Sequence, residues 1–169
     1  YLLAEAYERG DRFLPSQVNG IFQYLSYKGG FLQIGVGGGK SLLSLVVADQ
    51  GFRDGNDRIL LMCPPALVTK LMESDLRFAR QMVPLGVPIH CMHGKGASAR
   101  ARLAKRRPRG LYVFPYSLAS APDAEEIMGL IAPSLVVSDE SHRLANFSAF
   151  RTRRFSRFME EVKPQFVCM

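Results

Sequence analysis

The stretch GVGGGKS, residues 35–41, decides how the rest of the chain is interpreted. It follows an apolar run at residues 31–34, which predicts a short strand. It precedes an apolar run at residues 41–50, which predicts a helix ended by Gly51. Glycines let backbone N–H groups turn inward, and a helix start adds a partial positive charge. A strand, a glycine turn and a helix in this order are typical of a phosphate-binding loop.

Each polar group of this loop has an expected role. Glycine amides surround phosphates, the lysine reaches the outer phosphates, and the hydroxyl binds Mg²⁺. The residues concerned are Gly37, Gly38, Gly39, Lys40 and Ser41. The full motif has another glycine at position 34, where this chain has Ile34. A glycine turn used only for tight packing is the alternative, so a second site must decide.

That second site is LVVSDESH, residues 135–142, where an apolar strand ends in two carboxylates. Proteins with a phosphate-binding loop hold Mg²⁺ with an acid in this place. Asp139 is the candidate for the Mg²⁺ shell, and Glu140 for the base that orients and deprotonates an attacking water. The alternative is that both acids cap the next helix.

Strands and helices alternate along the whole chain, which predicts an α/β fold: a doubly wound parallel sheet with helices on both faces. Further strands are expected near residues 59–63, 89–93, 111–114, 135–137 and 166–169. Two apolar stripes are interpreted as core. They are Val18, Ile21, Phe22 and Leu25 in the first helix, and Phe147, Phe150, Phe155 and Phe158 in the last.

Composition limits the class of protein. With 47% hydrophobic and 22% charged residues, the 169-residue chain is typical of one globular domain. No apolar run reaches the roughly 20 residues that cross a bilayer, so we expect no membrane partner. Three scattered cysteines favour reduced thiols and an intracellular location, in the cytoplasm or at the nucleoid or nucleus.

The net charge of +7 equals the number of basic residues in one acid-free segment. They are Lys95, Arg100, Arg102, Lys105, Arg106, Arg107 and Arg109. Such a cluster suits a polyanion, although a solvated helix face is the alternative. His90, Cys91 and His93 do not indicate a metal site, because strand residues three apart point to opposite faces.

Taken together, the two motifs resemble those of superfamily-2 DExH-box helicases and translocases. Asp139-Glu140-Ser141-His142 is similar to their DExH box, and the loop to their G-x-G-K-[ST], which often lacks the first glycine. Residues 142–146, HRLAN, resemble the signature of the chromatin-remodeller-like branch, with Ala145 in place of a lysine.

The resemblance implies a RecA-like lobe that binds ATP and Mg²⁺. It implies that Gln17 recognises adenine and that His142 links the nucleotide site to motion. Residues 1–169 would be the first of two lobes and would end before motif III. The second lobe, absent here, would supply an arginine finger, so we expect negligible hydrolysis from this lobe alone.

The resemblance also implies contacts with a DNA or RNA backbone. The expected contact residues are Lys95, Arg100, Arg106, Arg107, Tyr116 and Ser117. The function implied is that of an ATP-dependent helicase or translocase, with duplex translocation favoured by Asn146. The alternative is a nucleotide-regulated scaffold or binding module that never turns over. A P-loop kinase is disfavoured, because kinases of that class lack a DExH box.

Overall fold

The computed structural model describes residues 13–35 and 37–169. Its centre is a six-stranded, all-parallel sheet in the order β1-β6-β5-β2-β4-β3. The strands are β1 (Gly30–Phe31), β2 (Arg58–Cys63), β3 (Ile89–Cys91), β4 (Gly110–Pro115), β5 (Leu135–Ser138) and β6 (Gln165–Cys168). This confirms the expected doubly wound α/β fold.

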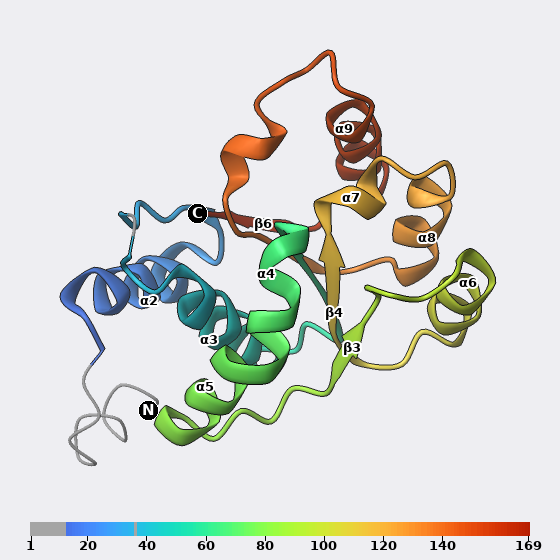
Figure 1. Cartoon of the computed structure of the whole chain (residues 1–169). Coiled ribbons are helices and arrows are strands. Elements are labelled where there is room, and N and C mark those ends of the chain that lie inside the picture. The colour runs from blue at the N-terminus through green and yellow to red at the C-terminus, as the bar shows by residue number, and fades with distance from the viewer. Residues whose placement is uncertain (1–12, 36) are drawn as a thin grey trace.

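Helices cover both faces of the sheet (Figure 1). One face carries α2 (Pro15–Tyr27), α3 (Lys40–Arg53), α4 (Pro65–Lys70), the π-helix η1 (Leu71–Asp75) and α5 (Leu76–Met82). The other carries α6 (Ala97–Arg106), α7 (Tyr116–Ala119), α8 (Ala124–Ile131) and α9 (Phe150–Val162). The short 3₁₀ helix η2 (Ser141–Leu144) follows β5.

The strands divide their side chains between two cores. In β2, Ile59 and Leu61 pack with the α3 side, whereas Leu60 and Met62 pack with the α8 side. This alternation follows from the two-residue repeat of a strand. Both sets are buried, as expected for a central strand of a parallel sheet.

The stripe expected in α2 is partly wrong. The buried residues are Gln17, Gly20, Ile21 and Tyr24, and Phe22 is 56% exposed. The helix is rotated relative to the expected face because Gly20 lies directly against the Leu43 side chain. That close approach turns Gln17 toward the glycine loop.

Two further expectations need correction. Helix α3 does not end at Gly51 but continues to Arg53. Gly51 is buried inside the helix, where an added Cβ would lie 2.5 Å from the Leu135 side chain, so close packing explains this glycine. The second concerns the phenylalanine stripe expected in the last helix, of which only Phe155 and Phe158 are buried in the core.

The other two phenylalanines of that stripe are exposed. Phe147 lies before α9 begins, and Phe150 is the first residue of the helix. The Arg153 guanidinium lies 4.8 Å from the centre of the Phe150 ring. The two rings therefore lie outside the core.

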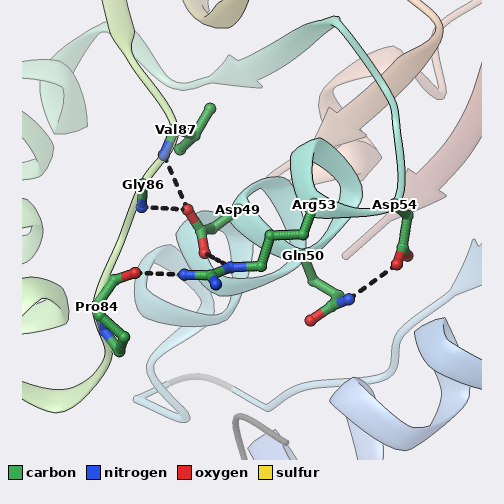
Figure 2. Close-up of polar contacts among 7 residues, drawn as sticks. All are labelled: Asp49, Gln50, Arg53, Asp54, Pro84, Gly86 and Val87. Carbon is green, nitrogen blue, oxygen red and sulfur yellow. Dashed lines mark hydrogen bonds and ion pairs between the residues drawn. The ribbon is translucent and has the colours of Figure 1, made fainter.

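A buried carboxylate fixes α3 to the segment before β3 (Figure 2). Asp49 Oδ1 accepts hydrogen bonds from the N–H groups of Gly86, at 2.7 Å, and Val87, at 2.9 Å. Its Oδ2 accepts one from Arg53 Nε at 2.8 Å, and the same guanidinium donates to the Pro84 carbonyl. This clamp holds the helix that begins at Lys40.

Candidate nucleotide-binding site

The glycine loop leaves the sheet between β1 and α3. Gly38 N–H donates to the Gly35 carbonyl at 3.1 Å, and Gly37 and Gly39 have φ angles of +78° and +71°. Only glycine adopts this left-handed region without strain. Val36 lies outside the described residues. The loop therefore turns tightly into the first residue of α3, Lys40.

Ile34 occupies the place of the missing motif glycine. Its side chain is buried, and an added Cβ on Gly38 would lie 2.6 Å from Ile34 Cγ2. The isoleucine therefore packs beneath the loop, and Gly38 is needed to make room for it. The departure from the full motif is accommodated by packing.

Gln17 supports the loop from α2. Its Nε2 donates to the Gly38 carbonyl at 3.1 Å, and its Oε1 accepts from Leu14 N–H at 2.9 Å. The side chain is buried and lies directly against Gly39. Both ends of the amide are thus engaged within the protein.

The two acids lie at the carboxyl end of β5. Asp139 is 3% exposed, and its Oδ1 has no hydrogen-bond partner among the described residues. Burial, and then the nearby charge of Glu140, raise the pKa of Asp139 from its ordinary 3.8 to about 6, while Lys40 opposes the rise. A buried carboxylate of this kind is stabilised by a bound cation.

Glu140 joins the two motifs. Lys40 Nζ lies 2.9 Å from Glu140 Oε1, and His142 Nδ1 lies 3.2 Å from Glu140 Oε2. Glu140 itself has a φ of +56°, an uncommon backbone state for a non-glycine residue. The contact between Lys40 and Glu140 makes the loop lysine and the second acid direct neighbours.

Asp139 and Ser41 carry oxygen atoms of the kind that Mg²⁺ prefers. Asp139 offers the partnerless carboxylate oxygen, and Ser41, at the start of α3, offers a hydroxyl. Mg²⁺ prefers oxygen and usually takes one or two protein ligands with phosphate oxygens and waters. Across residues 13–35 and 37–169, no three His, Cys, Asp or Glu side chains gather as a metal site.

Tyr116 lies underneath the acids rather than on the surface. It is 2% exposed, and its hydroxyl lies 2.7 Å from Ser138 Oγ and donates to the Asp139 carbonyl at 2.8 Å. The side chain therefore positions the end of β5, and the expected contact between Tyr116 and nucleic acid stays a prediction. Its neighbour Ser117 is exposed at the start of α7.

The basic segment does not form one surface. Arg100 is 11% exposed in its side chain and pairs with Asp123 at 2.7 Å, which links α6 to the start of α8; its expected contact with a nucleic-acid backbone stays a prediction. Lys95 lies after β3, at the carboxyl edge of the sheet, and is exposed.

The other end of the basic segment lies at the opposite edge. Arg106 is the last residue of α6 and Arg107 follows it, before β4 begins at the amino edge of the sheet. Arg107 Nε also donates to the Leu130 carbonyl at 2.7 Å. The two ends of the basic segment therefore lie at opposite edges of the sheet.

One wall of the site was not expected from the sequence. A cavity of about 200 Å³ borders the loop. Its lining residues are Gln17, Gly39, Ser41, Leu42, Lys70, Asp75 and Phe78. The last three come from α4, η1 and α5, and Asp75 is close enough to contribute to the raised pKa of Asp139.

The fold matches solved structures of helicase and translocase cores. One is the Sulfolobus solfataricus SWI2/SNF2 ATPase core in complex with dsDNA, with a TM-score of 0.63 and 15% identity over 93% of this chain. Another is the UvsW helicase from bacteriophage T4, with a TM-score of 0.65 and 16% identity over 93% of this chain. A third is the DUF1998 helicase MrfA bound to DNA and AMPPNP, with a TM-score of 0.64 and 17% identity over 99% of this chain.

These matches establish a RecA-like fold. The chain spans 31%, 52% and 25% of the three matched chains, in the same order. No family model and no curated protein matches the sequence. Within the described part of the chain, no helix has the length and apolar character needed to cross a membrane.

Proposed function

We propose that this chain is the ATP-binding lobe of a DExH-type motor that hydrolyses ATP to move along nucleic acid. The observation that carries the proposal is the 2.9 Å contact between Lys40 Nζ and Glu140 Oε1. Two motifs far apart in the sequence meet at the carboxyl edge of a parallel sheet, where such folds bind ligands.

The loop residues bind the triphosphate. The amides of Gly37, Gly38 and Gly39 surround the phosphates at the start of α3, and Lys40 binds the outer ones. Mg²⁺, held by Ser41 and Asp139, supplies positive charge to the phosphate oxygens when it is bound. The raised pKa of Asp139 supports this role, because a cation compensates the cost of its burial.

Glu140 acts as the base. In the structure its carboxylate holds Lys40, so nucleotide binding transfers Lys40 to the γ-phosphate and releases Glu140 to hold a water. The water oxygen attacks the γ-phosphorus, its proton moves to Glu140, and the bond to the β–γ bridging oxygen breaks. His142 lies beside the other oxygen of the carboxylate. It keeps Glu140 oriented and links the nucleotide site to motion.

Nucleic acid binds along the carboxyl edge, with Lys95 and Ser117 on the backbone. Two of the matched structures contain DNA, which supports DNA as the polymer. Backbone contacts are independent of sequence and weaken as salt rises. A second lobe supplies the arginine finger and closes over the nucleotide. A second lobe is consistent with the partial coverage of the matched chains. In phosphoryl-transfer enzymes an arginine finger can be supplied by another part of the assembly.

The test is ATP hydrolysis by the whole protein with and without duplex DNA, forked DNA and RNA. Glu140→Gln should lower turnover by about 10²- to 10⁴-fold, the usual contribution of a general base, and keep nucleotide affinity. Lys40→Ala should lower affinity as well. Glu126→Gln, an exposed acid on α8, is the control and should behave as the wild type. Nucleic-acid-stimulated turnover that survives both site variants would overturn the proposal.

A further inference from the structure

The helix that follows β2 contains one residue too many for a regular α-helix. Its buried positions are Val68, Leu71, Leu76, Ala79 and Met82. Most spacings are three residues, but Leu71 and Leu76 are five apart, which an α-helix would place on different faces. The π-helix at Leu71–Asp75 absorbs the extra residue. Single π turns of this kind are often found at functional sites.

The π turn decides which side chains face the glycine loop. Removing one residue would rotate α5 by about 100° relative to α4. In the observed register Asp75 and Phe78 line the cavity beside Gln17, Gly39 and Ser41. Lys70 Nζ lies 3.7 Å from Asp75 Oδ1 at the rim.

Phe78 is an unusual residue for this position. It is 52% exposed, although its neighbours Leu76 and Ala79 are buried in the core. The exposed ring therefore contributes little to the core, and it lies in the wall of a cavity that shares Gly39 and Ser41 with the phosphate loop. A flat apolar face beside a phosphate site suits the base of a nucleotide.

The size of the cavity restricts what it holds. At about 200 Å³ it is smaller than the roughly 300–1,000 Å³ of a site that encloses a whole drug-sized ligand. It has room for one part of a nucleotide, while the phosphates remain on the loop outside. The Asp75 carboxylate and the Lys70 ammonium at the rim suit the hydroxyls of a ribose.

We propose that Phe78 is the stacking face of a base subsite, formed between α2, the start of α3 and the π turn. This inference rests on the proposed nucleotide site at Lys40. Gln17 then acts mainly as a support, because its amide already bonds to Gly38 and Leu14. Stacking tolerates every base, since each has a π face, so the subsite binds ATP and GTP with similar affinity.

The experiment compares ligands with and without a base in the whole protein. Dissociation constants are measured by calorimetry for ATP, GTP and inorganic tripolyphosphate, each with Mg²⁺. Phe78→Ala should weaken ATP and GTP by about 5- to 150-fold, the range of one base–aromatic stack, and leave tripolyphosphate unchanged. Phe78→Leu, which keeps apolar volume without a ring, should weaken ATP as well, and Phe78→Trp should retain binding.

The matched control is Phe22→Ala, which removes a ring of similar exposure from the outer face of α2 and should leave all three affinities unchanged. Wild-type ATP affinity in Phe78→Ala or Phe78→Leu, with binding lost in Lys40→Ala, would overturn the base subsite but keep the phosphate site. Equal weakening of ATP and tripolyphosphate would assign Phe78 to the shape of the loop and overturn stacking. A wild-type protein that binds neither ligand would overturn the proposed function as well.

Discussion

At neutral pH, the buried carboxylate of Asp139 should make the protein less stable than a variant with an uncharged side chain at this position. Its pKa rises from 3.8 to about 6 on folding, and at about 1.4 kcal/mol per pH unit this corresponds to about 3 kcal/mol. The side-chain amide of the variant Asp139→Asn carries no charge but keeps polar atoms in the same place, which costs about 1 kcal/mol. The variant should therefore be about 2 kcal/mol more stable at neutral pH.

The sign of the pH dependence follows from the direction of the shift. Because the folded pKa of Asp139 is raised, the folded protein holds this proton more tightly than the unfolded chain. The stabilisation is complete below pH 3.8 and is lost as the pH rises through about 6. The advantage of Asp139→Asn should therefore be absent near pH 4 and complete above pH 7.

Urea unfolding at both pH values, and melting temperature at the higher one, measure the effect without added nucleotide or metal. For a domain of this size, 2 kcal/mol corresponds to a rise of about 4–8 °C in Tm. Asp57→Asn is the control, because Asp57 forms an exposed pair with Arg109 and its loss should cost at most about 1 kcal/mol. A destabilised Asp139→Asn, or a gain that is the same at both pH values, would refute the reasoning.

Three other changes test particular contacts. Tyr116→Phe removes both hydroxyl contacts below Asp139 and should cost about 1–3 kcal/mol in urea unfolding; an unchanged midpoint would contradict the positioning role. Asp49→Ala leaves the N–H groups of Gly86 and Val87 without their acceptor and should cost about 2–4 kcal/mol, whereas Asp54→Ala, in an exposed pair with Lys28, should cost less than about 1 kcal/mol. Lys95→Ala should weaken DNA binding, and it should make the slope of log K against log salt concentration shallower by about one. Arg107→Ala, at the other edge of the sheet, should change neither the affinity nor the slope.

The sequence was sufficient for the order of elements and for the two motifs. The apolar runs at each strand and the helix start at Lys40 depend on residues that are neighbours in the sequence. Such features can be predicted without knowing the tertiary contacts. A phosphate loop and an acid after a later strand predict one shared site, and the family resemblance leads to the same expectation. The 2.9 Å contact between Lys40 and Glu140 agrees with that expectation.

Features that depend on tertiary packing could not be predicted in the same way. The rotation of α2 depends on Gly20 meeting Leu43, and the burial of Tyr116 depends on the register between β4 and its neighbours. Charge alone could not distinguish Lys95 from Arg107, because the segment runs from one edge of the sheet to the other. One signal was present: the five-residue spacing between Leu71 and Leu76 indicates the π turn that brings Phe78 to the loop.

The central claim is that Lys40 and Asp139 act on the same Mg²⁺–triphosphate group. Calorimetric titration of ATP into the wild type, Lys40→Ala, Asp139→Asn and the double variant, with Mg²⁺ and with EDTA, tests it most directly. We predict that Asp139→Asn weakens ATP binding only when Mg²⁺ is present, that Lys40→Ala weakens it in both conditions, and that the two effects with Mg²⁺ are not additive. Full ATP affinity in Asp139→Asn with Mg²⁺, or strict additivity of the two changes, would contradict the account.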